Sequence, residues 1–293
     1  MTPKILHLIG YAFSRAGIDP GCSEGPWVLQ RSPYLPTLKQ HDIDYKWDDV
    51  IAFASAPELS LAQDVSLHCQ TLAVNIKNAI SAKHFFAVIG GDHTSAIGTW
   101  YGAAATLSGD LGLIWLDAHM DSHTPETSES GRLHGMPLAC LLGAGYPELT
   151  TTFSATPAIK PENLCLIGVR SFEAGEAAFL KKLGVRIYYM DEIKQRGLST
   201  ILAEAKTLVS ARTVAFGISL DLDCIDPSQA PGVDAVAPDG IEADELCAAL
   251  TQFADEEKLL GIEIAEFNPH RDRDHLTEQR IIQLLACTVG NNS

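Results

Sequence analysis

The chain has 293 residues, of which 46% are hydrophobic, and this is enough to build a large buried core within one α/β domain. Its 37 acidic and 21 basic residues give a formal net charge of -16. A surface of this sign repels nucleic acids and anionic membranes, so neither is expected as a partner. Metal ions or a small cationic substrate would be attracted to it.

The cysteines and the N-terminus indicate where the protein works. Seven cysteines are scattered along the chain without a Cys-x-x-Cys pair, which predicts reduced thiols rather than a disulfide framework or a zinc ribbon. Cys224 is expected to pack in the core, although it follows Asp223. The N-terminus has no cleavable signal pattern, and no stretch reaches the ~18 apolar residues that span a bilayer. We therefore expect a cytoplasmic protein.

Short apolar runs alternate with longer helical patterns along the chain. The predicted strands are 5–9, 85–89, 111–116, 164–169, 185–189, 214–220 and 259–265. The predicted helices are 61–82, 175–183, 198–209 and 243–254. Most strands are apolar at consecutive positions, as is typical of strands that are covered on both faces. We predict a three-layer α/β/α fold with a mostly parallel central sheet, and residues 1–293 as a single domain.

Three segments rich in Gly, Pro, Ser and Asp interrupt this alternation, at 17–36, 122–135 and 226–240. Their composition indicates turns, and no linker or repeat divides the chain. The second and third segments follow runs of ionisable residues, so we expect them to recognise the substrate.

Ionisable residues follow two of the apolar runs. Asp117, His119 and Asp121 come after one run, and Asp221 and Asp223 come after another. Side chains two residues apart in an extended chain point the same way, so each group can converge. The carboxyl ends of parallel strands lie at one edge of a sheet, and this arrangement brings the two groups together.

A third segment, Gly90–Thr94 (Gly-Gly-Asp-His-Thr), adds His93. An isolated Asp-x-Asp pair is common at strand ends, and the two glycines alone would indicate only a tight turn. Several ionisable groups packed behind apolar strands, however, repel one another or lose hydration unless a cation lies among them. The pattern predicts a site for divalent metal ions, with Asp92 as a partner of a ligand rather than a ligand.

Together these runs resemble the signatures of the ureohydrolase superfamily, which includes arginase, agmatinase and formimidoylglutamase. The matching segments are Gly90–Thr94, Asp117–Asp121 and Ser219–Pro227. Two further segments, Glu126–Leu138 and Ala265–Pro269, are most similar to the substrate loop and the late glutamate motif of arginases. The order and spacing match throughout the chain, so the resemblance implies an arginase-like fold.

The resemblance also implies two manganese ions per subunit. The expected ligands are His93, Asp117, Asp121 and Asp221 for one ion, and His119 and Asp223 for the other, with aspartates bridging. Two divalent ions that share a solvent oxygen lower its pKa, so hydroxide becomes available to attack the guanidinium carbon and release urea and an amine. The ligand types favour manganese, although zinc, iron and cobalt also bind such ligands. Members of the superfamily commonly assemble as trimers or hexamers, so a homo-oligomer is expected.

Three residues are expected to be catalytic. The leaving amine must be protonated, and His134 resembles the histidine that carries the proton in arginases. Outside the segment Glu126–Leu138, a histidine such as His134 would be interpreted as a hydrogen-bonded residue at the start of a helix. Glu266 is expected to orient the guanidinium by paired hydrogen bonds; otherwise it is a strand-end glutamate. The third is Asp121, whose loss should abolish turnover.

The positions expected to bind the rest of the substrate depart from the arginase pattern. His123 and Arg132 replace asparagines, and Glu173 replaces an aspartate, whereas the hydroxyls of Ser128 and Ser130 are retained. The hydroxyls would bind an α-carboxylate and Glu173 an α-ammonium, but Arg132 or a protonated His123 could anchor a carboxylate instead.

A further departure lies in Asp234–Gly240, which includes Ala235 and lacks the Gly-Thr-Pro and Gly-Gly of typical arginases. We predict hydrolysis of L-arginine to L-ornithine and urea. The alternative substrates are formimidoylglutamate and, less favoured, agmatine, because Arg132 and His123 suit an additional carboxylate. A non-catalytic regulatory homologue is the third alternative, and the complete set of ligands argues against it.

Overall fold

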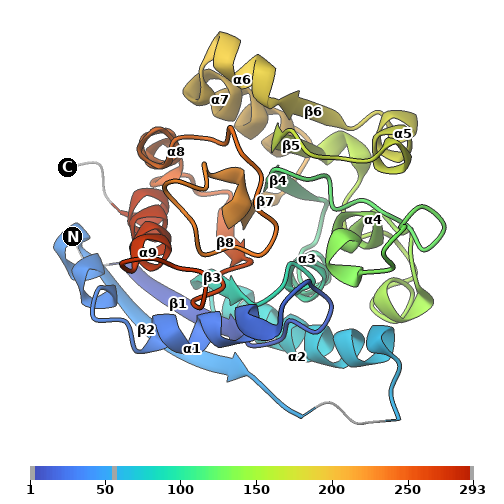
Figure 1. The fold of residues 1–293 in the computed structure, drawn as a ribbon, viewed down its shortest axis with the longest axis horizontal. Coiled ribbons are helices and arrows are strands. Elements are labelled where there is room, and N and C mark those ends of the chain that lie inside the picture. The colour runs from blue at the N-terminus through green and yellow to red at the C-terminus, as the bar shows by residue number, and fades with distance from the viewer. Residues whose placement is uncertain (1–3, 55–57, 291–293) are drawn as a thin grey trace.

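The computed structural model describes residues 4–54 and 58–290 of the chain. One sheet lies at the centre, with eight strands in the order β2-β1-β3-β8-β7-β4-β5-β6 and every neighbouring pair parallel (Figure 1). The strands are β1 (Lys4–Tyr11), β2 (Ile43–Ile51), β3 (Phe85–Gly90), β4 (Leu111–Leu116), β5 (Leu164–Val169), β6 (Arg186–Tyr189), β7 (Ala215–Asp221) and β8 (Leu259–Ala265). The predicted parallel sheet is confirmed.

Helices cover both faces of this sheet. They are α1 (Gly25–Gln30), α2 (Leu61–Ser81), α3 (Ser95–Ala104), α4 (Pro137–Leu141), α5 (Ala174–Leu183), α6 (Met190–Arg196), α7 (Leu198–Ser210), α8 (Ala243–Leu250) and α9 (Leu276–Val289). Side chains of α2, α3, α4 and α5 join one core cluster, and those of α1, α6, α7, α8 and α9 join the other. The predicted α/β/α layering is confirmed.

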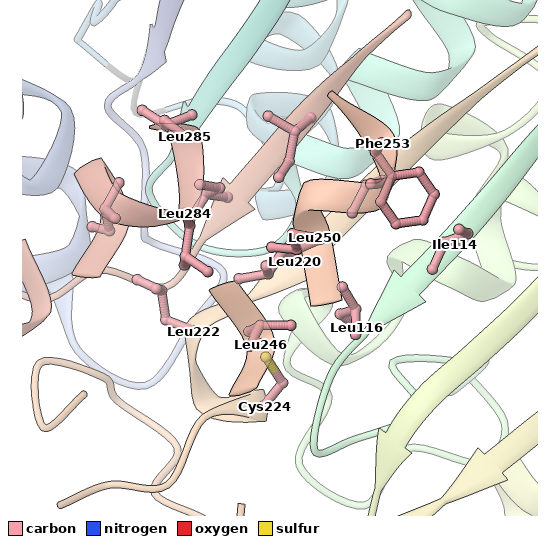
Figure 2. Close-up of a cluster of buried hydrophobic side chains, with 14 of the residues drawn as sticks. Ile114, Leu116, Leu220, Leu222, Cys224, Leu246, Leu250, Phe253, Leu284 and Leu285 are labelled. Carbon is pink, nitrogen blue, oxygen red and sulfur yellow. The ribbon is translucent and has the colours of Figure 1, made fainter. Parts of the chain in front are cut away.

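Apolar side chains on both faces of the central strands fill the two core clusters. Figure 2 shows part of one of them, to which Ile114 of β4, Leu220 of β7, Leu246 of α8 and Leu284 of α9 all contribute. Every residue of β4 and β5 is buried. A strand that is covered on both faces needs apolar residues at successive positions, and this explains the runs in the sequence.

Six elements were not predicted, namely β2, α1, α3, α4, α6 and α9, and the sequences of β2, α3 and α1 lack the expected patterns. Strand β2 lies at the edge of the sheet, where it pairs only with β1, and most of its side chains are at least partly exposed and polar. Helix α3 is buried on nearly all sides and so has no polar face. Helix α1 lies inside the segment 17–36, whose turn residues concealed it. Helix α9 was also not predicted, although its buried positions recur at helical spacing.

All seven cysteines lie in the described part of the chain and are free, as predicted. Cys224 packs in the core among leucines of β7 and α8 (Figure 2). Within the described ranges, no helix combines the length and apolar character needed to cross a membrane. The charged run Arg271–His275 is largely exposed, and Asp272 in it accepts hydrogen bonds from the first backbone N–H groups of α9.

The order of the strands places all the expected ligands at one edge. Strands β3, β8, β7 and β4 are consecutive neighbours in the middle of the sheet. The residues that follow or end them are His93 after β3, Glu266 after β8, Asp221 and Asp223 at the end of β7, and Asp117, His119 and Asp121 after β4. Because all four strands run in the same direction, their carboxyl ends meet there.

Candidate metal centre

Four buried residues from three strand ends form the first ligand group. His93, Asp117, Asp121 and Asp221 each place one ligand atom within 4.8 Å of the others. Nδ1 of His93 lies 3.0 Å from an oxygen of Asp121, 3.2 Å from one of Asp221 and 3.5 Å from one of Asp117. The structure thus brings together the four residues expected at one metal ion.

The second group consists of Asp117, His119 and Asp223, whose ligand atoms also lie within 4.8 Å of one another. Nδ1 of His119 is 3.0 Å from Asp223 and 3.5 Å from Asp117. Asp117 belongs to both groups and offers Oδ2 to the first and Oδ1 to the second. Its position between the groups is that of a carboxylate that can bridge two cations.

The chemistry of His93 fits a metal ligand. Its Nε2 lies 3.1 Å from the hydroxyl of Ser219, which in turn donates to Glu263, so Nε2 carries the hydrogen. Its Nδ1 is buried, has no hydrogen-bond partner and points at the carboxylates of the first group. A ring nitrogen whose opposite N–H is fixed in this way is the usual arrangement at a metal site.

The electrostatics of the two groups also require a cation. Burial raises the pKa of Asp221 well above its usual value, and the charges of Asp223 and Asp117 raise it further. Burial lowers the pKa of His119, but the carboxylates of Asp223 and Asp117 overcome this and raise it strongly. Without metal, protons must supply the missing positive charge, whereas divalent ions in the same space would replace them.

Two of the site residues adopt a backbone conformation that is rare outside glycine. The φ angle is +46° at Asp121 and +68° at Glu266. Both turns are fixed by backbone hydrogen bonds, from Leu138 N–H to the Asp121 carbonyl and from Glu266 N–H to the Gly91 carbonyl. Such strain persists only where the surroundings hold it, and it turns both carboxylates toward the site.

Glu266 and His134 form an ion pair beside the ligand groups. Oε1 of Glu266 lies 3.1 Å from Nδ1 of His134 and accepts the backbone N–H of His93 at 2.9 Å. The thiol of Cys22 lies 3.5 Å from Oε2. Burial lowers the pKa of His134, but the hydrogen bond and charge of Glu266 raise it to about 9. With this pKa, His134 carries a proton at neutral pH.

A cavity of about 180 Å³ opens above these groups. Its inner end is lined by His119, Asp121, Asp221, Asp223, His134 and Glu266. Ala235 and all five residues expected to bind the rest of the substrate line its outer end. These five are His123, Ser128, Ser130, Arg132 and Glu173. The cavity therefore runs from a strongly acidic floor to a mixed, polar mouth.

Two buried glutamates that contact site residues were missed in the sequence. Glu176 lines the cavity, where its carboxylate lies 3.4 Å from His123. Its signal was its place three residues after Glu173, where the two form a capping box at the start of α5. Glu263 was visible as the one charged residue in the apolar run of β8, and it supports Ser219 and thereby His93.

Comparisons with known proteins identify the family. A model of the Arginase family matches residues 4–290. The arginase of Bacillus caldovelox is 39% identical over 295 residues, with 98% of each chain covered. The chain belongs to the arginase family. This membership implies a binuclear metal site, and the two ligand groups that share Asp117 are the place for it.

Solved structures agree with this family assignment. The crystal structure of the arginase from Bacillus subtilis matches with a TM-score of 0.91 and 33% identity, covering 99% of each chain. A formimidoylglutamase from Bacillus subtilis matches less well, with a TM-score of 0.79 and 26% identity, covering 98% of this chain and 87% of that one. The arginase family fold therefore extends over essentially the whole chain.

Proposed function

We propose that the protein is an arginase, which hydrolyses L-arginine to L-ornithine and urea with two manganese ions per subunit. The observation that carries the proposal is the pair of ligand groups sharing Asp117 at the floor of a cavity that also holds the Glu266–His134 pair. The relatives named arginase, at up to 39% identity over the whole chain, support it.

The two ions, when bound, lower the pKa of a shared water so that hydroxide is available near neutral pH. The protein supplies the acidic floor that attracts the guanidinium group. Glu266 is buried, and its hydrogen bonds from His134 and His93 lower its pKa against the effect of burial, so it is ionised. Its carboxylate can then accept paired N–H bonds from the guanidinium and aim the guanidinium carbon at the ligand groups.

His134 is the proton donor for the leaving amine. It lines the same cavity as Glu266, and its raised pKa keeps it protonated at neutral pH. The imidazolium ring can transfer its proton to the ornithine nitrogen. The protonated nitrogen is a better leaving group when its bond to the guanidinium carbon breaks. Asp121, which lines the inner end of the cavity, completes the catalytic set.

A second candidate substrate is formimidoylglutamate. Arg132 lines the mouth of the cavity, and no carboxylate of the described residues lies within salt-bridge distance of its guanidinium group. A free guanidinium group there favours a substrate that has a carboxylate at its outer end, and agmatine has none. A purely regulatory role is disfavoured because the expected ligands form two groups that share Asp117, and His134 and Glu266 line the cavity next to them.

The deciding experiment compares three substrates on the purified, manganese-loaded protein. Release of the amine product is measured with L-arginine, agmatine and formimidoylglutamate, and Asp121→Ala is the inactive control. Ornithine and urea from L-arginine, absent in the control, would support the proposal. Turnover of another substrate alone would refute it, and bound metal without any turnover would favour the regulatory role.

Three further expectations belong to this proposal. Residues 1–293 act as a single domain, the subunits assemble as a trimer or hexamer, and the enzyme works in the cytoplasm. Sedimentation of the manganese-loaded protein would test the oligomer, because a monomer at micromolar concentration would contradict it.

A further inference from the structure

At the outer end of the cavity, the side chain of His123 contacts the carboxyl groups of Glu173 and Glu176. Nε2 of His123 lies 2.9 Å from Oε2 of Glu173 and 3.4 Å from Oε2 of Glu176. Its other nitrogen lies 3.2 Å from the hydroxyl of Thr127, which also lies 3.4 Å from the carbonyl oxygen of Thr124. Because the carboxylate of Glu173 is an acceptor, Nε2 carries the hydrogen and donates it to Glu173.

The two glutamates therefore have donors from the protein itself. Glu176 is buried and accepts the backbone N–H groups of Ser122 at 3.1 Å and of Glu173 at 3.2 Å. Burial and the neighbouring Glu173 raise the pKa of Glu176 to about 8, so it holds a proton that it can share with Glu173. An ammonium group of a substrate would have to compete with His123 for Oε2 of Glu173.

The other polar side chains at the mouth of the cavity, those of Ser128, Ser130 and Arg132, have hydrogen-bond donors that are free to bind a substrate. The hydroxyls of Ser128 and Ser130 accept the backbone N–H groups of Gly131 and Arg132, so their own hydrogens remain free to donate. Both serines and the Arg132 side chain line the cavity. This combination suits a carboxylate, and it offers nothing further to an ammonium group.

We propose that His123 makes this enzyme largely indifferent to the α-ammonium group, so that it also hydrolyses ω-guanidino carboxylic acids that lack this group. The inference rests on the proposed function, because it assumes that the guanidinium is cleaved at the floor of the cavity. The test compound is 5-guanidinopentanoate, which is arginine without its amino group. Water adds to its guanidinium carbon, the bond from that carbon to the chain nitrogen breaks, and the nitrogen takes a proton, giving urea and 5-aminopentanoate.

The first measurement is the ratio of kcat/KM for L-arginine to kcat/KM for 5-guanidinopentanoate. A site built to bind an N–H group typically rejects an analogue lacking it by a factor on the order of 10⁴, whereas we expect a ratio within about 10 here. His123→Asn frees Glu173 to bind the ammonium group, and we expect it to raise the ratio by about 10-fold or more. His41→Asn makes the same change in an exposed histidine that does not line the cavity, and it should leave the ratio unchanged.

The second measurement is binding without chemistry. Dissociation constants of L-ornithine and 5-aminopentanoate, measured by calorimetry on the manganese-loaded protein, should differ by less than about 10-fold in the wild type and by more in His123→Asn. If no guanidino compound releases urea, the proposed function has failed. These two constants still decide the present inference in that case.

Two results would overturn the inference. One is a wild-type preference for the compounds with an α-ammonium group on the order of 10³ or more, in either measurement. The other concerns a cation at the mouth, because His123, Glu173 and Glu176 place ligand atoms within 4.8 Å of one another. If the wild type binds three manganese ions per subunit and His123→Asn binds two, the histidine serves a metal ion and not the selection of substrate.

Discussion

The proposed role of Glu266 is to orient the guanidinium group of the substrate, and replacing Glu266 by its neutral isostere tests this role. Glu266→Gln keeps the size of the side chain but removes the charge that pairs with His134 and with the substrate. Removing one partner of a buried charge pair costs about 2–5 kcal/mol, so kcat/KM for L-arginine should fall by roughly 30-fold or more. Glu266 is outside the two groups that share Asp117, so the manganese content should not change.

The same variant also separates orientation from general damage to the site. If Glu266→Gln loses manganese together with activity, the residue supports the ligands instead of the substrate. If kcat/KM changes by less than about 3-fold, well below the cost of a broken buried charge pair, Glu266 does not bind the guanidinium at all.

The convergence of the six expected ligand residues was predictable, because their spacing and their places after apolar runs determine where they lie. Asp117 and His119 follow β4 at alternate positions, and Asp221 ends β7, a neighbouring strand. The contacts of His123 were not predictable, because they depend on Glu173, which lies 50 residues away in another loop. Sequence spacing predicts neighbours along a strand end, but it does not specify how two loops meet.

At the scale of elements, the contact between α3 and β7 is set by one glycine. A Cβ atom on Gly217 would lie 2.0 Å from Cζ3 and 2.1 Å from Cη2 of Trp100. Gly217→Ala should therefore lower the free energy of unfolding by about 3 kcal/mol, measured by urea unfolding. Combining it with Trp100→Phe, which removes both atoms and an unpaired buried N–H, should restore at least ~1 kcal/mol relative to the sum of the single changes. Simple additivity would contradict this account.

The carboxylate of Asp48 links the edge strand β2 to His7 of β1, a contact that the sequence pattern did not reveal. Asp48 lies at the irregularity in the β1–β2 pairing, where its carboxylate is 2.6 Å from Nδ1 of His7 and 2.9 Å from Nζ of Lys46. The polar side chains of β2 concealed the strand, because an edge strand needs few buried residues. Central strands such as β4 and β5 were predicted with their exact bounds because burial on both faces leaves little choice of residue.

The stability that the contacts of Asp48 contribute should depend on pH. Partial burial raises the pKa of Asp48, but the hydrogen bonds from Lys46 and His7 outweigh it and lower the pKa below its usual value. The stability that Asp48 contributes is therefore present above the unfolded pKa of about 4 and is lost as the pH falls through the lower folded value. Asp48→Asn should reduce the free energy of unfolding by about 1 kcal/mol at pH 7, with a smaller difference at pH 3. A difference that is the same at both pH values would exclude the charge as its cause.

For the whole molecule, the buried ligand groups make stability depend on metal. Asp117, Asp121, Asp221 and Asp223 are all buried beneath one cavity, and their mutual repulsion opposes folding unless cations are present. An ion that binds only the folded state stabilises it by about 2.7 kcal/mol at 100 times its dissociation constant. For a chain of this size, such a change should raise the thermal midpoint by roughly 5 °C or more.

The measurement is the thermal midpoint of chelator-treated protein with and without added manganese. The same pair of scans on Asp121→Asn separates the effect of the ions from that of folding in general. This variant removes one buried charge, so its metal-free form should be at least as stable as metal-free wild type, while most of the rise with manganese is lost. Equal midpoints for the wild type with and without manganese, or a full rise in Asp121→Asn, would show that the carboxylates fold without needing the ions.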